Sequence, residues 1–293
     1  MRWKKVQGQG DMEDRRGQGG GMFGGGGGLP IPMGKGAGGI GIIIAIVAAL
    51  LLGGNILGGG GGDSGFSPGS GLQPAPPAGQ GSTPEKGDDT VFEFTKFVSK
   101  DAQDVWAQIF TSAGKQYPRA PVVTFTGGTQ TGCGPASAAT GPFYCPADNK
   151  VYLDLSFFQE LSRRFGAPGD FAIAYVITHE LGHHVQTVLG IEGNVRRQQQ
   201  NDPGNANLYL VRLELQADCF AGVWAHSTYQ RGLLEEGDID EGLAAAAAVG
   251  DDRLGARSPE QWTHGSAALR TEWFRKGFES GDPNDCDTGG VEI

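Results

Sequence analysis

The stretch THELGHH, at residues 178–184, carries two histidines four positions apart and a glutamate directly after the first. The apolar residues on both sides of it predict a helix. On a helix, residues four apart lie one turn apart on the same face. His179 and His183 can therefore bind one zinc ion together, and Glu180 is placed to reach a water bound to that ion.

A catalytic zinc site needs a third protein ligand, because three ligands leave one position open for water. The apolar-periodic stretch at residues 211–224, VRLELQADCFAGVW, predicts a second helix with Glu214 and Asp218 one turn apart. We interpret Glu214 as the third ligand and Asp218 as the acceptor that orients a ligand imidazole. The exchanged assignment, with Asp218 on the metal, is the alternative.

These motifs resemble a known family. HELGHH followed by ELQAD resembles the gluzincin arrangement, HExxH with a downstream ExxxD. Several flanking stretches, EDRRGQGGG, CGPASAATGPFYCP, VYLDLSFF, THGSAALRTEWF and CDTGG, are similar to the neutral zinc metallopeptidases of bacteria. The resemblance spans nearly the whole chain and is weakest in its Gly/Pro-rich part. It implies a zincin-like fold, Zn2+ as the cofactor and a protein or peptide substrate.

The mechanism that the resemblance implies is metal-assisted hydrolysis. Zinc lowers the pKa of its water towards roughly 7, and Glu180 removes the proton and later delivers it to the leaving amine. A further donor stabilises the oxyanion. His264 is the candidate for this role and Tyr209 the second choice, while a helix-capping or core histidine is the alternative for His264. His184 and His226 are interpreted as structural.

A second class of function uses the same residues. A catalytically idle, zinc-stabilised and membrane-tethered binding or scaffolding module would also keep three zinc ligands. Such a module has no need of a carboxylate at Glu180, so the presence of this residue favours the enzyme. Nucleic-acid binding is excluded on charge, because the formal net charge is −10 and basic clusters with interleaved aromatics are missing from the sequence.

Composition divides the chain. Up to about residue 88, Gly, Pro, Ser and Gln dominate, a mixture that buries too little apolar surface to fold. The uncharged run from Ile40 to Leu57 is about long enough to cross a bilayer. We therefore expect a Gly-rich segment at 1–37, a transmembrane helix at 38–58, a linker at 59–89 and a metallopeptidase domain at 90–293. A cleaved signal peptide is the alternative for the apolar run.

Charge predicts the orientation of that span. The segment before it contains six basic and three acidic residues, a net charge of +3, whereas the whole chain carries −10. Lys and Arg near a membrane favour the cytoplasmic side. We therefore expect a single-pass inner-membrane protein with a cytoplasmic N-terminus and a periplasmic catalytic domain. The sequence predicts no oligomeric state.

All four cysteines follow the predicted span, and an even number in an oxidising compartment predicts disulfides. We favour Cys133 with Cys145 and Cys219 with Cys286, because the first two flank a short segment that contains Gly and Pro. The other two pairings stay open. A zinc site made of the four cysteines is the structural alternative, but the sequence has no Cys-x-x-Cys spacing to support it.

The predicted fold class is α+β, with a small sheet packed on the two site helices. An edge strand within residues 136–144 could hold an extended substrate by strand addition. Asp251 and Asp252 are interpreted as exposed helix-end residues or as partners of Arg253, with cation binding as the alternative. The remaining expected elements are helices at 91–112 and 156–165, strands at 121–126 and 151–155, and a site helix that Asp170 caps and Gly190 ends.

Overall fold

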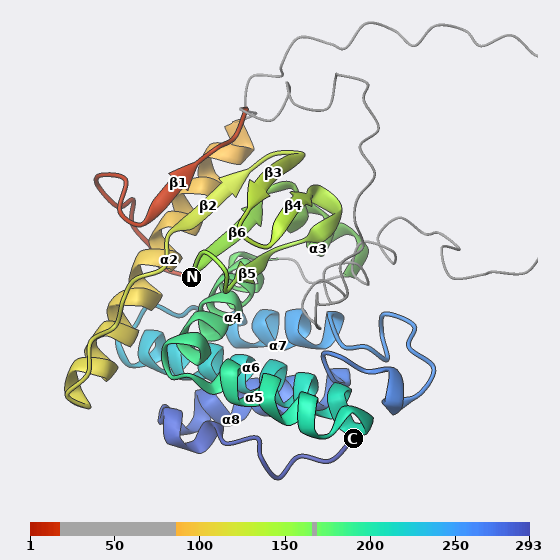
Figure 1. The fold of residues 1–293 in the computed structure, drawn as a ribbon. Coiled ribbons are helices and arrows are strands. Elements are labelled where there is room, and N and C mark those ends of the chain that lie inside the picture. The colour runs from red at the N-terminus through yellow and green to blue at the C-terminus, as the bar shows by residue number, and fades with distance from the viewer. Residues whose placement is uncertain (18–85, 166–168) are drawn as a thin grey trace, which may run out of the picture.

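The structure is a computed structural model that describes residues 1–17, 86–165 and 169–293. Within these residues the fold is mixed α+β, as predicted (Figure 1). The strands are β1 (Met12–Asp14), β2 (Val122–Phe125), β3 (Gly128–Thr131), β4 (Gly134–Ser137), β5 (Phe143–Cys145) and β6 (Lys150–Asp154). The α-helices are α2 (Lys86–Ser112), α3 (Ser156–Phe165), α4 (Asp170–Val188), α5 (Ile191–Asn201), α6 (Ala206–Gln230), α7 (Asp238–Ala248) and α8 (Ala267–Ser280).

The main sheet has the strand order β1-β2-β6-β5. β1, β2 and β6 run parallel, and β5 pairs with β6 antiparallel, with Phe143 opposite Tyr152. All four residues of β2 are buried, which is what its run of apolar and β-branched residues predicts. The edge strand expected within 136–144 is β5, and β4 belongs instead to a separate hairpin with β3.

Residues 1–17 belong to the folded unit. Met12 of β1 pairs with Val122 of β2, and Lys150 of β6 donates to Glu13 at 2.8 Å. The prediction that the packed domain starts near residue 90 is therefore wrong for this segment. Composition did not reveal it because a strand of three residues, MED, depends on pairing and ion pairs and shows no apolar pattern.

The pairing of β1 with β2 also conflicts with the prediction that a membrane separates the N-terminal segment from the C-terminal domain. β1 and β2 share hydrogen bonds, so both lie in one compartment, whereas a single crossing between them would place them in two. The predicted span at 38–58 lies outside the described residues. Among the residues that are described, no helix is long and apolar enough to cross a bilayer. The predicted linker ends earlier than residue 89, because α2 already begins at Lys86.

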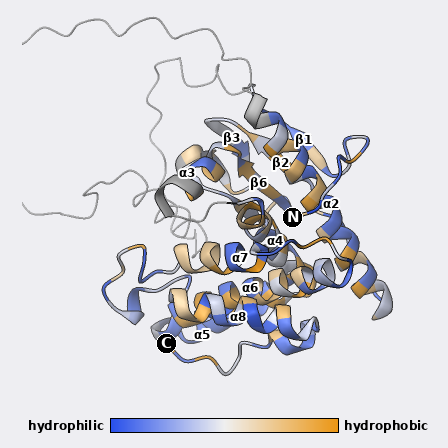
Figure 2. Ribbon diagram, turned by 180° about the vertical axis from the view of Figure 1, so that it is seen from behind, coloured by the Kyte–Doolittle hydropathy of each residue, from blue (hydrophilic) through white to orange (hydrophobic). Residues whose placement is uncertain are grey.

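Helix α4 lies between the sheet and four of the helices, since Figure 1 shows α5, α6, α7 and α8 on the side of it away from the sheet and α2 and α3 beside the strands. Most of α4 is buried, and α4, β2 and β6 show hydrophobic colour in Figure 2. Its N-cap is Gly169, so Asp170 is the first helical residue and not the predicted cap. Gly182 allows α4 and α6 to cross closely, because a Cβ there would lie 3.1 Å from the Ala217 backbone.

Both predicted disulfides are confirmed. Cys133 is bonded to Cys145 and joins the β3–β4 hairpin to edge strand β5. Cys219 is bonded to Cys286 and joins α6 to the C-terminal segment, across a sequence separation of 67 residues. The second bond lies on the same helix as the predicted third zinc ligand, which connects the chain's C-terminal part to the site.

Candidate metal centre

The three predicted ligands come together between α4 and α6. One ligand atom each of His179, His183 and Glu214 lies within 4.8 Å of the other two. The Nε2 atom of His179 is 3.1 Å from Glu214 Oε2, and the Nε2 atom of His183 is 3.4 Å from Glu214 Oε1. Two imidazoles and one carboxylate are a ligand set that binds zinc with a fourth position open. The donor set therefore fits the metal that the sequence implies.

The electrostatics of this position favour a positive charge. Burial alone would lower the pKa of His179, but the carboxylates of Asp218 and Glu214 outweigh it and raise that pKa to about 10. The pKa of His183 is also raised, because Glu214 outweighs the effect of burial. A cation that replaces the imidazole protons meets the same carboxylates, so the site is suited to a metal ion.

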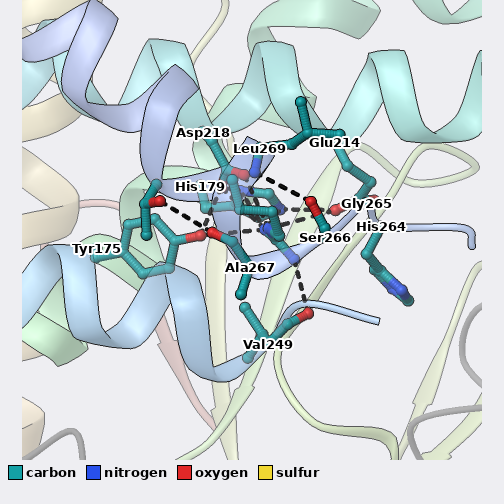
Figure 3. A network of polar contacts seen from close by, with 12 residues as sticks. Tyr175, His179, Glu214, Asp218, Val249, His264, Gly265, Ser266, Ala267 and Leu269 are labelled. Carbon is teal, nitrogen blue, oxygen red and sulfur yellow. Dashed lines mark hydrogen bonds and ion pairs between the residues drawn. The ribbon is translucent and has the colours of Figure 1, made fainter. Parts of the chain in front are cut away.

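Asp218 lies behind His179, on the side away from Glu214. Its Oδ1 accepts the hydrogen bond from His179 Nδ1 at 2.8 Å and a second one from the hydroxyl of Tyr175 (Figure 3). Arg270 of α8 donates to both carboxylate oxygens, from Nε at 2.8 Å and from Nη2 at 2.9 Å. Both oxygens of Asp218 accept hydrogen bonds from these groups, so Asp218 orients the imidazole. The alternative assignment, with Asp218 as a direct zinc ligand, finds no support in the geometry.

The Asp218–Arg270 pair is buried, since Arg270 is 3% exposed and Asp218 fully enclosed. Burial alone would raise the pKa of the Asp218 carboxyl, but Arg270 and His179 outweigh it and hold the pKa below its usual range. Glu214 lies 3.8 Å from the same guanidinium. Asp218 therefore carries its charge at neutral pH, which strengthens its hold on the ligand imidazole.

Gln186 plays the corresponding part for the second histidine. Its Oε1 lies 2.9 Å from His183 Nδ1, so that nitrogen is directed away from the ligand position. The Nε2 atom of each histidine is thereby left for the metal, and Glu214 completes the set. One imidazole is supported by a charged carboxylate and the other by a neutral amide.

Glu180 lies beside the ligands in a cavity of about 350 Å³. The cavity is lined by His179, His183 and Glu214, and also by His264. The Glu180 carboxylate makes no hydrogen bond or ion pair with any residue that the structure describes. A carboxylate left without a partner next to a metal site is available to accept a proton.

His264 is fixed by Asp251, an aspartate that was expected to be exposed or paired with Arg253. Asp251 is 4% exposed, and its Oδ1 lies 3.1 Å from His264 Nδ1. Its Oδ2 accepts the backbone N–H groups of Thr263, His264 and Gly265 at 2.7, 2.7 and 2.9 Å. The expectation of an exposed residue or a partner of Arg253 was wrong for Asp251, because a backbone loop encloses its carboxylate.

The other histidines and the alternative donor lie elsewhere. His184 is buried against the carbonyl of Pro118, at 2.7 Å from its Nε2, on another face of α4. His226 contacts the carbonyl of Phe278. The hydroxyl of Tyr209 donates to Asp202 at 3.0 Å, and Tyr209 is not among the described residues that line the cavity. The structure thus brings His264 to the site and leaves Tyr209 outside it.

Four residues that support the site were not predicted as such: Tyr175, Gln186, Asp251 and Arg270. Two of them had a local signal, because Tyr175 precedes His179 by four positions and Gln186 follows His183 by three, and both spacings share a helix face. The other two had none, since Asp251 and Arg270 come from segments that only the tertiary fold brings to α4.

Comparison with known proteins places the chain in a family. Residues 1–289 match the family described as "putative neutral zinc metallopeptidase", and the chain belongs to it. The matched region includes β1, so the N-terminal strand is inside the family's shared sequence.

Two relatives show how far the similarity extends. The chain is 44% identical over 299 residues to the uncharacterized protein YpfJ of Escherichia coli K12, and the match covers 100% of both chains. It is 50% identical over 188 residues to the uncharacterized protein Rv2575 of Mycobacterium tuberculosis H37Rv, covering 59% of this chain and 63% of the relative. No solved structure matches the chain.

Proposed function

We propose that this chain is a zinc-dependent metallopeptidase with His179, His183 and Glu214 as ligands and Glu180 as the general base. The observation that supports it best is the convergence of three ligand atoms within 4.8 Å in the same cavity as the Glu180 carboxylate, which has no partner among the described residues. A site with a purely structural metal has no use for that carboxylate.

Each residue has a defined task in peptide hydrolysis. Zinc, when bound, polarises the peptide carbonyl and makes water more acidic. Glu180 accepts the proton of the attacking water and delivers it to the leaving amine. His264, which lines the cavity and is held at Nδ1 by Asp251, stabilises the negative charge that develops on the carbonyl oxygen. Asp218 and Gln186 keep the two ligand imidazoles in orientation.

The cavity favours an extended peptide with apolar side chains. Its lining includes Phe143 and Tyr144 of β5, Val195 of α5 and Leu213 of α6. β5 is an edge strand with one backbone side paired to β6, so its other side can pair with a substrate backbone.

The proposal is tested with the full-length chain, since residues 1–17 are part of the fold. Zinc content and cleavage of casein or a peptide library are measured for the parent, Glu180→Gln and the exposed control Glu272→Gln. We expect Glu180→Gln to keep zinc and to lose activity by about 10²- to 10⁴-fold, with the control unchanged. A parent that binds zinc and cleaves no peptide favours the idle scaffolding module. Equal activity in all three proteins rejects Glu180 as the base.

We also propose that the folded unit, including residues 1–17, is periplasmic and that segment 38–58 contacts the inner membrane. The two disulfides support an oxidising compartment. Since both flanks of segment 38–58 belong to one folded unit, any membrane contact by it must begin and end on the periplasmic side.

Labelling with a membrane-impermeant maleimide tests this topology through the exposed positions Lys5→Cys and Lys115→Cys. We expect equal labelling of the two variants in spheroplasts. Protection of Lys5→Cys alone would restore a single-pass topology with a cytoplasmic N-terminus.

A further inference from the structure

Gln186 uses its whole amide to connect the second ligand histidine to α6. It is fully buried, and its Oε1 faces His183 Nδ1 at 2.9 Å. Its Nε2 donates to the backbone carbonyl of Leu213 at 2.7 Å and to Gln216 Oε1 at 3.1 Å. Because a carbonyl only accepts, the nitrogen of the amide must face α6 and the oxygen must face the imidazole.

The connection continues into the C-terminal segment. Gln216 Nε2 donates to the backbone carbonyl of Cys286 at 2.9 Å. This carbonyl fixes the orientation of the second amide by the same logic, so that Gln216 turns its oxygen towards Gln186. An unbroken series of hydrogen bonds therefore runs from the metal ligand to a backbone group more than a hundred residues later in the sequence.

The disulfide fixes the end of this series. Cys286 is bonded to Cys219, which lies on α6 one turn after Gln216. Further along, Arg212 donates to the carbonyl of Val291 at 2.7 Å, and Thr288 donates to the carbonyl of Arg212 at 2.8 Å. The segment after α8 is therefore held along α6 by one covalent bond and several hydrogen bonds.

The orientation of Gln186 has a direct consequence for the metal site. With its oxygen towards His183, the proton of the neutral imidazole resides on Nδ1 and Nε2 keeps its lone pair for the metal. With the amide reversed, its N–H would face Nδ1 and favour the tautomer that has its proton on Nε2. That tautomer cannot bind a metal through Nε2.

We propose that Gln186, Gln216 and the Cys219–Cys286 disulfide form one positioning chain that holds His183 ready for zinc. The C-terminal segment is then part of the metal site, although none of its residues is a ligand. This inference rests on the proposed function, because it takes His183 as a zinc ligand.

The expected loss of zinc affinity is smaller the farther the replaced group lies from His183. Loss of a group that supports a ligand weakens metal affinity by about 10- to 100-fold. We expect Gln186→Leu to weaken zinc affinity by an amount in that range. Gln216→Leu and the double variant Cys219→Ala/Cys286→Ala should each weaken zinc binding by about tenfold, at the lower end of the range, because the Leu213 carbonyl still holds Gln186.

The test is zinc affinity of the full-length chain, measured by competition with a chromophoric chelator. The matched control is Cys133→Ala/Cys145→Ala, which removes the disulfide on β5 and leaves the series untouched. We expect the control to keep the parental affinity and the Cys219/Cys286 variant to lose about tenfold. Gln216→Leu added to the Cys219/Cys286 variant should cause no further loss, because the two changes break the same series.

Three results would overturn the inference. One is parental zinc affinity in Gln216→Leu, which keeps both disulfides and so remains informative if the cysteine variants do not fold. Another is an equal loss of affinity in both disulfide variants, which would indicate a general effect of stability. The third is full additivity of Gln216→Leu and Cys219→Ala/Cys286→Ala. A parent chain that binds no zinc would instead reject the proposed function itself.

Discussion

Two buried aspartates each hold the Nδ1 atom of a histidine in the same cavity, but they are stabilised differently. Asp218, which holds His179, is neutralised by the guanidinium of Arg270. Asp251, which holds His264, accepts three backbone N–H groups and contacts no Arg or Lys side chain among the described residues. The first arrangement depends on a buried charge pair, and the second on the shape of a loop.

The difference follows from what each histidine has to do. A metal ligand gains from a fully charged partner, because the carboxylate raises the basicity of the imidazole. The donor His264 has to be placed at a fixed point, and a rigid loop does this. The loop turns at Gly265, whose φ of 92° is a conformation that favours glycine.

Replacing Asp218 should cause the largest loss of stability. Asp218→Asn removes the main counter-charge of Arg270 and leaves a buried guanidinium, which costs about 3–5 kcal/mol. We expect the lower end of that range, because Glu214 stays 3.8 Å from Arg270. Urea unfolding of the metal-free chain measures the change. If Asp218→Asn lowered the free energy of unfolding by less than Asp251→Asn, Arg270 would not depend on Asp218 as the counter-charge of a buried guanidinium.

Replacing Asp251 should lower the free energy of unfolding by less than replacing Asp218. Asp251→Asn keeps an oxygen for the backbone N–H groups but turns charge-assisted hydrogen bonds into neutral ones, a loss of about 1–2 kcal/mol. The same unfolding experiment gives the value. Zinc affinity should stay at the parental level, because His264 is not a ligand, and a large drop in affinity would mean that the two aspartates are not separate in function.

The advantage of the parent over Asp251→Asn should depend on pH. Burial alone would raise the pKa of the Asp251 carboxyl, but His264 and the backbone N–H groups outweigh it and lower that pKa in the folded state. A lowered pKa stabilises the fold above the unfolded value of about 3.9, and this stability is lost as the pH falls through the folded pKa. The free energies of unfolding of the parent and of Asp251→Asn should therefore converge as the pH is lowered from neutral. A difference between them that grows in acid would contradict a lowered pKa of Asp251.

Removing the hydroxyl of Tyr175 should have the smallest effect. Tyr175→Phe deletes one of the donors to Asp218 and leaves Arg270 in place, so we expect a loss of about 1 kcal/mol. Unfolding in urea measures it, with Tyr229→Phe, an exposed tyrosine, as the matched control. If Tyr175→Phe cost as much as Asp218→Asn, the hydroxyl and not the guanidinium would be the principal support of the carboxylate.

The ligand helices were predictable because their signals are local. Helical periodicity located α4 and α6, and a spacing of four residues placed His179 with His183 and Glu214 with Asp218. The strands β2 and β6 followed from short β-branched and alternating runs. Cysteine count and compartment led to both disulfides, although spacing alone left three pairings open.

The parts that were missed depend on tertiary contacts. β1 has three residues and a charged sequence, and only its pairing with β2 makes it a strand. Asp251 was interpreted as an exposed charge or a partner of Arg253, and Arg270 was assigned no role, because only the tertiary fold brings α8 and the loop after α7 to the cavity. A buried ion pair and a carboxylate enclosed by backbone N–H groups leave no periodic trace in the sequence.

The number and affinity of zinc ions bound by the full-length chain test the proposed ligand set most directly. We compare the parent with Glu214→Ala and with Glu272→Ala, the same substitution at an exposed position of α8. We expect about one zinc ion per chain for the parent and for Glu272→Ala, and loss of tight binding in Glu214→Ala alone. Unchanged zinc binding in Glu214→Ala would contradict the site formed by His179, His183 and Glu214.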